Sequence, residues 1–92
     1  MDQTIGQLEQ DLARAEYSAR TRGCYYSHAV AMARRFGKPV AAVTRDELRA
    51  FVDETMAGEG GVRRKKDCLC ALLFLYRKTL GQPEMVSFIK LP

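Results

Sequence analysis

The sequence predicts an all-α fold, a compact bundle of four main helices followed by a short C-terminal helical turn. Apolar residues recur every three or four positions in four successive segments, and glycines and prolines separate these segments. No segment alternates apolar and polar residues as a half-buried strand would. At 92 residues, we expect one small domain, 1–92, that can bury a modest core without disulfides or metal ions.

The first helix is expected between Thr4 and about Glu16. Thr4 followed by Gln7 has the spacing of a capping box, in which two side chains satisfy backbone N–H groups at a helix start. One apolar stripe follows at helical spacing, formed by Ile5, Leu8, Leu12 and Ala15.

The second helix is expected from Ser18, whose hydroxyl can cap it, to Phe36. Its apolar stripe consists of Tyr25, either His28 or Ala29, Met32 and Phe36. The helix should end at Gly37-Lys38-Pro39, because proline lacks the N–H group that a helix interior needs.

The third helix begins with the clearest capping box of the chain, Thr44 with Glu47 three positions later. Its predicted buried face consists of Leu48, Phe51, Val52, Thr55 and Met56. Three glycines, at positions 58, 60 and 61, then end the helix.

The fourth helix, from about Val62 to Leu80, is predicted to be the central element, with Gly81 as its C-cap. Most of its circumference is apolar, with a cluster of Leu69, Leu72, Leu73, Tyr76 and Leu80 flanked by Cys68, Ala71 and Leu75. The remaining sector is mostly charged but also contains Cys70 and Phe74. We expect Phe74 to be covered by a turn that starts at Pro83 and brings Met85, Phe88 and Ile89 over it. The alternative is that Phe74 docks another domain or protomer.

The three cysteines and the lone histidine do not form a recognisable metal or catalytic motif. Cys24, Cys68 and Cys70 lack metal-finger spacing, so we expect reduced thiols and no metal or cofactor, with Cys68 and Cys70 buried or half-buried. Cys24 and His28 lie one helical turn apart, but no third group that could orient a catalytic pair is visible. His28 is expected at the boundary of the core.

Charge alternates along the chain in a way that the net charge of +4 conceals. Residues 1–16, 17–38, 39–60 and 61–80 carry charges of −3, +5, −3 and +5. If the second and fourth helices share one side of the bundle, a positive surface forms there, which suits duplex nucleic acid. A membrane surface fits less well, because the bulky apolar groups are committed to a core. With no secretory signal and no apolar stretch of membrane-spanning length, we expect a cytoplasmic protein.

Two helix starts concentrate the groups that bind phosphate. The second helix opens with Ser18, Arg20, Thr21 and Arg22, whose hydroxyl and guanidinium donors are those most used to fix a protein on a DNA backbone. Ser18 and Thr21 can also simply cap their own helix, and both roles can coexist. The fourth helix opens with Arg63-Arg64-Lys65-Lys66, where exposed backbone N–H groups also attract anions, although such a run can equally be a solvated face.

The sequence resembles the N-terminal, core-binding, SAM-like domain of tyrosine recombinases, the phage and integron integrases. The resemblance covers roughly residues 5–92 and rests on motifs in a characteristic order. These motifs are Tyr17-Ser18-x-Arg20-Thr21 with Tyr25, Phe36-Gly37-Lys38, Thr44 with Glu47 and Phe51, and the block from Leu69 to Arg77 with Leu80-Gly81.

The resemblance implies a DNA-binding half-clamp for recombination-site duplex DNA, which works with a separate C-terminal catalytic domain and neighbouring recombinase protomers. The starts of the second and fourth helices would lie on the DNA. The implied DNA-binding residues are Ser18, Arg20, Thr21, Arg22, Tyr25, Lys38, Arg63, Arg64, Lys65 and Lys66. Where the family often has Thr and Asn, this chain has Arg64 and Lys66, which favours phosphate contact over base readout.

The family's catalytic residues have no counterpart in this chain, so the chain alone is not expected to be an enzyme. The tyrosines lack a supporting catalytic constellation, and Lys90-Leu91-Pro92 resembles the linker into the catalytic domain. A different class of function stays open, a small basic helical domain that binds an acidic protein surface and self-associates through the Phe74 region.

Overall fold

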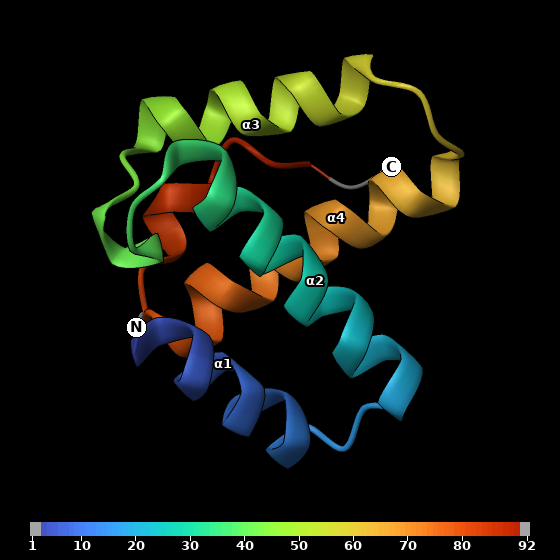
Figure 1. Ribbon diagram of the computed structural model, residues 1–92, viewed down its shortest axis with the longest axis vertical. Helices are drawn as coiled ribbons and strands as arrows, with labels where there is room; N and C mark the ends of the chain where they lie inside the picture. The colour runs from blue at the N-terminus through green and yellow to red at the C-terminus, as the bar shows by residue number, and fades with distance from the viewer. Residues whose placement is uncertain (1–2, 91–92) are drawn as a thin grey trace.

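The computed structural model describes residues 3–90, which form an all-α bundle without strands (Figure 1). The main helices are α1 (Gln3–Arg14), α2 (Ala19–Phe36), α3 (Arg45–Ala57) and α4 (Val62–Phe74). Three short elements complete the fold: the 3-10 turns η1 (Val40–Ala42) and η3 (Pro83–Val86), and the π-helical turn η2 (Leu75–Thr79) that continues α4. The predicted all-α class with four main helices is confirmed.

The central position of α4 is also confirmed. In Figure 1, α2 and α4 cross between α3 on one side and α1 on the other. Helix α4 packs against α2 and α3, and η2 packs against α1. The buried residues of this continuous element are Cys68, Leu69, Ala71, Leu72, Leu73, Leu75 and Tyr76. Each fully buried leucine contributes about 1.5–3 kcal/mol of transfer free energy, so this one element supplies much of the stabilisation by burial.

Two of the predicted helix starts have the expected caps. The Ser18 Oγ accepts a hydrogen bond from the backbone N–H of Thr21, at 3.2 Å. At α3, the Thr44 Oγ1 accepts from the Glu47 N–H (3.1 Å) and the Glu47 Oε1 accepts from the Thr44 N–H (3.0 Å). Helix α2 ends as expected at Gly37, whose φ of 64° is a left-handed conformation that glycine adopts without steric cost.

The predicted boundaries of the first helix were partly wrong. Thr4 lies inside α1, so it does not occupy the N-cap position that the capping-box prediction gave it. The helix ends at Arg14, and Glu16 has a φ of 60°, which reverses the chain toward Ser18. Ala15 is consequently exposed instead of completing the apolar stripe. Periodicity alone could not place these ends, because threonine, glutamine and alanine also occur inside helices and in turns.

The fourth helix reaches the predicted end by a different hydrogen-bond pattern. From Leu75 the backbone adopts π-helical geometry, and the Leu80 N–H donates to the Leu75 carbonyl at 3.0 Å. Gly81 follows with a φ of 63°, as expected for a glycine that ends a helix. On α3, the expectation for Met56 was wrong, because 44% of its surface is exposed at the end of the buried face.

The C-terminal turn does not cover Phe74, which corrects the predicted packing. Segment η3 packs against α3, α4 and η2. The Phe88 ring lies under the guanidinium groups of Arg45 and Arg49, 5.7 and 5.4 Å from its centroid. Phe74 instead contacts two tyrosine rings from the start of α2 and the loop before it. The angular positions of residues around α4 showed that Phe74 needs a covering partner. They could not show which neighbouring segment provides it.

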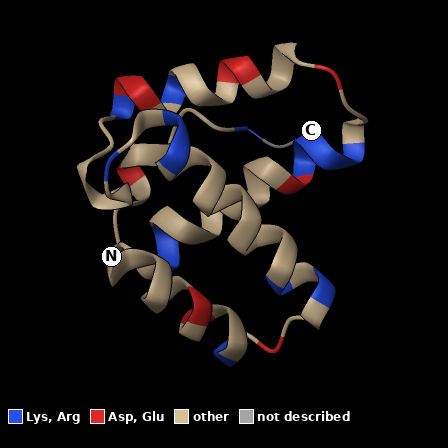
Figure 2. Cartoon of the chain, in the orientation of Figure 1, with Lys and Arg blue, Asp and Glu red and all other residues tan. Residues whose placement is uncertain are grey.

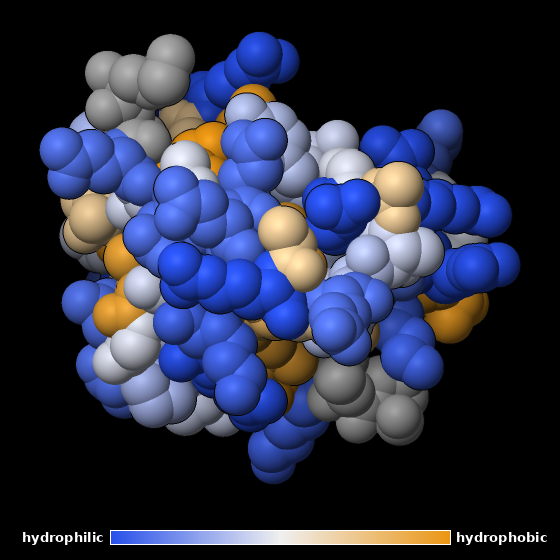
Figure 3. All heavy atoms as spheres, turned by 90° about the horizontal axis from the view of Figure 1, so that it is seen from below, coloured by the Kyte–Doolittle hydropathy of each residue, from blue (hydrophilic) through white to orange (hydrophobic). Residues whose placement is uncertain are grey.

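The surface is largely hydrophilic, with small separate apolar patches on the face seen from below (Figure 3). Among the helices of residues 3–90, none is long and apolar enough to cross a membrane. The linker predicted at residues 90–92 extends into positions 91 and 92, which lie outside the described residues.

Candidate nucleic-acid interface

The starts of α2 and α4 flank one cleft of the molecule. Figure 2 shows the basic residues at both helix starts on the same side of the molecule, whereas the acidic residues lie mainly on α1, α3 and the connecting loops. Between the two starts is a cleft of about 210 Å³. Its lining residues are Arg20, Thr21, Cys24 and Tyr25 from α2, and Arg63 and Asp67 from α4. We call it the α2–α4 cleft.

The hydroxyl groups at the start of α2 are already engaged with each other. Besides accepting from the Thr21 N–H, the Ser18 hydroxyl donates to the Thr21 Oγ1 at 3.0 Å. Thr21 is half-buried, whereas Ser18 and Arg20 are exposed. Ser18 therefore caps the helix and donates its only hydroxyl proton to Thr21, so the exposed Arg20 guanidinium is the donor accessible to an anion at this helix end.

The basic run at the start of α4 divides between two sides of the helix. Arg63 lines the α2–α4 cleft. Arg64 and Lys65 line a second hollow between α2, α3 and α4, together with Glu54 and Glu59. Lys66 is exposed and, at 100° per residue, lies in the same sector of α4 as Arg63. The N-cap residue is Gly61, which has no side chain to cap the helix, so the first backbone N–H groups lack a side-chain acceptor from the N-cap.

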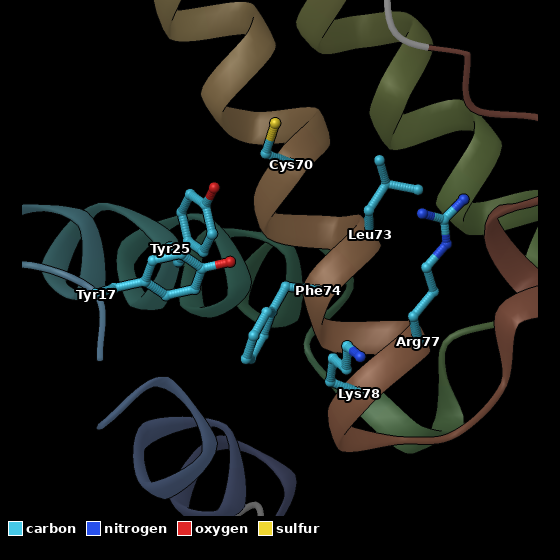
Figure 4. Close-up of a pocket in the computed structure, with 7 residues that line it drawn as sticks. All are labelled: Tyr17, Tyr25, Cys70, Leu73, Phe74, Arg77 and Lys78. Atoms are coloured by element: carbon cyan, nitrogen blue, oxygen red, sulfur yellow. The ribbon is translucent and has the colours of Figure 1, made fainter. Parts of the chain in front are cut away.

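An aromatic hollow adjoins the α2–α4 cleft at Tyr25 (Figure 4). The ring of Phe74 lies 5.8 Å from that of Tyr17 and 6.3 Å from that of Tyr25. The hydroxyl groups of both tyrosines point toward α4. The other lining residues are Cys70, Leu73, Arg77 and Lys78. Cleft and hollow together form one surface with aromatic rings at its centre and cations at both ends.

The Tyr25 hydroxyl is a neutral hydrogen-bond donor at this surface. Burial, followed by the neighbouring Cys70 thiol, raises the pKa of Tyr25 to about 12. The hydroxyl therefore keeps its proton at neutral pH and adds no negative charge beside the arginines.

Four residues of the predicted DNA-binding set, Arg22, Lys38, Arg64 and Lys65, lie away from the α2–α4 cleft. Arg22 faces α1 and lines a groove with Glu9, Leu12 and Tyr26. Lys38 follows the opposite end of α2, about 27 Å from its start for an 18-residue helix, and forms an ion pair with Glu47. Arg64 and Lys65 belong to the second hollow, as described above.

Sequence reasoning did not assign Tyr17, Arg77 or Lys78 to the interface. Arg77 and Lys78 belong to the mostly charged sector of the fourth helix, which is the sequence signal that could have identified them. Their association with Tyr17 depends on how α2 crosses α4, and no local pattern encodes that crossing.

The surroundings of the three thiols and of His28 are typical of residues that support the fold. All three cysteines are free; Cys68 is buried and Cys70 half-buried, as predicted, and Cys24 is half-buried too. Burial, and then the Asp67 carboxylate, raises the pKa of Cys24, whereas a nucleophilic thiol needs a lowered one. His28 is half-buried at the core boundary, as expected, and burial lowers its pKa. Residues 3–90 contain no group of three or more His, Cys, Asp or Glu side chains that could hold a metal ion.

Fold and surface together define a small helical domain with a basic and aromatic face built on two helix starts. Comparison with known protein families matches residues 5–84 to the family described as phage integrase, N-terminal SAM-like domain. The match covers most of the chain, so the chain belongs to this family. The matched domain is the N-terminal part of these integrases and not their catalytic domain. No curated protein and no solved structure matches the chain.

Proposed function

We propose that this chain is the DNA-binding, core-binding domain of a site-specific tyrosine recombinase. It grips duplex DNA of the recombination site mainly through phosphate contacts. Family membership supports the recombinase context. The phosphate contacts are inferred from the chemistry of the α2–α4 cleft.

The observation that carries the proposal is the pairing of Arg20 and Arg63 across this cleft. The ion pairs among residues 3–90 involve Arg14, Arg35 and Lys38, and none includes either cleft arginine. Two guanidinium groups without carboxylate partners within ion-pair distance attract anions from two different helices. Thr21 and Tyr25 add hydroxyl donors between them, and this combination suits the oxygens of a DNA backbone.

The proposed contact surface extends from the cleft along α4. Lys66 lies in the same sector as Arg63, and Arg77 and Lys78 line the aromatic hollow about three turns further along the helix. These cations would follow a phosphate backbone, with Tyr25 between the two groups. Lys38 and Arg22 would contribute less, because they lie away from this line.

The proposed partners follow from the same context. They are duplex DNA, the C-terminal catalytic domain of the same recombinase, and neighbouring recombinase protomers in the cytoplasm. On this proposal the chain supplies affinity and position, while the cleavage chemistry and any catalytic residues reside in the other domain. No cofactor or metal is required for phosphate contacts of this kind.

Fluorescence anisotropy with a labelled duplex tests the proposal. Removing one phosphate contact by Arg20→Gln should weaken binding about eightfold at 0.1 M salt, the factor expected from counterion release. The matched control is Arg34→Gln, an exposed arginine about 21 Å further along α2 by helical rise. It removes the same charge and should change affinity far less. Equal losses in both variants would show that net charge, and not the α2–α4 cleft, determines binding.

A further inference from the structure

The α2–α4 cleft contains one carboxylate, and its position is unusual for a surface that binds phosphate. Asp67 is the only acidic residue between positions 61 and 80, and it lines the cleft with Arg20 and Arg63. It directly follows the basic run Arg63-Arg64-Lys65-Lys66 at the start of α4. A carboxylate at this point repels a phosphate group, so it weakens the very contact that the two arginines favour.

The Asp67 carboxylate also retains acceptor capacity. Its Oδ2 accepts a hydrogen bond from the Cys24 Sγ–H at 3.9 Å, a weak contact. Arg63 lies one helical turn before Asp67, yet no ion pair within 4.0 Å joins Asp67 to a cation in residues 3–90. An ionised carboxylate has about four lone-pair sites, and the half-buried Asp67 side chain lines the cleft.

We propose that Asp67 is a specificity-determining residue that accepts a hydrogen bond from the 4-amino group of a cytosine in the DNA major groove. This inference rests on the proposed function. Arg20 and Arg63 at the two sides of the cleft hold the phosphates, and the carboxylate between them meets a base edge.

The base-edge chemistry selects cytosine. Guanine presents two acceptors, N7 and O6, and thymine presents the O4 acceptor and a methyl group, and both repel or exclude a carboxylate. Adenine presents an amino group next to the N7 acceptor, which opposes a second carboxylate oxygen. Cytosine presents its amino donor without a neighbouring acceptor in the groove. The domain would therefore read one base even though its other groups contact the backbone.

A structural role for Asp67 makes a different prediction. If the carboxylate only offsets repulsion among Arg20, Arg63 and Arg64, its removal lowers thermal stability and strengthens binding to every duplex. Base preference then stays unchanged. Specificity must therefore be measured separately from stability and total affinity.

The test is selection from a randomised duplex library at 0.15 M salt, with the wild-type chain, Asp67→Asn and Asp53→Asn. Asp53 is an exposed carboxylate on α3 that does not line the cleft, so it controls for the loss of one charge. The wild-type chain and Asp53→Asn should enrich cytosine at one position, with another base costing about 5- to 100-fold in affinity. Asp67→Asn should shift that position toward adenine, because an amide matches the adenine N6 and N7 atoms.

A substitution on the DNA gives a second readout, in which each protein is compared with itself on two duplexes. At the selected position, cytosine is replaced by 2-pyrimidinone, which lacks the 4-amino group. The wild-type chain should lose affinity about 5- to 100-fold more than Asp67→Asn does. No cytosine preference in the wild type, an unchanged preference in Asp67→Asn, or equal losses with 2-pyrimidinone would overturn the role of Asp67. Absence of binding to any duplex would overturn the proposed function as well.

Discussion

The basic run at the start of α4 is divided between two sides of the helix. This division gives a prediction in which one pair of cations serves as the control for the other pair. Arg63 lines the α2–α4 cleft and Lys66 lies about 60° from Arg63 around the helix axis, whereas Arg64 and Lys65 line the hollow near Glu54 and Glu59. The double variants Arg63→Gln/Lys66→Gln and Arg64→Gln/Lys65→Gln each remove two positive charges from the same four-residue run. If only the first pair contacts phosphates, the two variants should bind DNA with different affinities.

The expected magnitude follows from counterion release. Each phosphate contact contributes about 0.9 to the slope of log affinity against log salt, so two lost contacts should make the slope shallower by about 1.8. At 0.1 M salt the same two contacts correspond to about 60-fold in affinity. For Arg64→Gln/Lys65→Gln we expect less than half of that change in slope, because these side chains face a hollow that already contains carboxylates.

The assay is fluorescence anisotropy with one duplex at five or more salt concentrations, supported by thermal melting of each variant. Neither pair is buried, and fewer cations at a helix N-terminus should leave the melting temperature unchanged or slightly raised. Equal slopes for the two double variants, or a larger effect of Arg64→Gln/Lys65→Gln, would refute the division of the run between two sides.

Three further predictions concern stability and are measured by urea unfolding. Burial, and then Arg64, lowers the pKa of His28 in the folded state, so its contribution to stability is complete above the ordinary histidine pKa of about 6.5 and is lost as pH falls through the folded-state pKa. The free energy of unfolding should thus decrease from pH 7.5 to 5.5, and a stability that rises over this range contradicts the assignment. Thr44→Ala removes the acceptor of the capping box and should cost about 1 kcal/mol, whereas Thr44→Ser should retain most of it. The Tyr76 hydroxyl is buried without a hydrogen-bond partner in the described structure, so Tyr76→Phe should raise the free energy of unfolding by about 1 kcal/mol, and a clear loss would indicate a missed partner.

Local signals in the sequence predicted the helices well. Ser18, Thr44 and Gly37 act within one helical turn, so their capping roles depend on few neighbours. The apolar sector of α4 likewise predicted its central position. The false capping box at Thr4 shows the limit, because the same residue types are compatible with a helix interior.

Features that depend on how helices cross could not be predicted in the same way. The π turn at Leu75 and the covering of Phe74 by Tyr17 are set by packing between distant segments. The same holds for the functional surface. The charge pattern indicated which two helices carry the positive charge. The position of Asp67 between two arginines and the orientation of Arg22 toward α1 could be found only in the three-dimensional structure.

The salt dependence of duplex binding by the unmodified chain tests the central claim most directly. Contacts with about four to six phosphates predict that log affinity falls with log salt with a slope of roughly −4 to −5. A small helical domain that binds an acidic protein surface would give no binding to duplex DNA even at low salt. A flat salt response or the absence of binding would therefore contradict the account, and a slope near the predicted value would support a basic face that grips the DNA backbone.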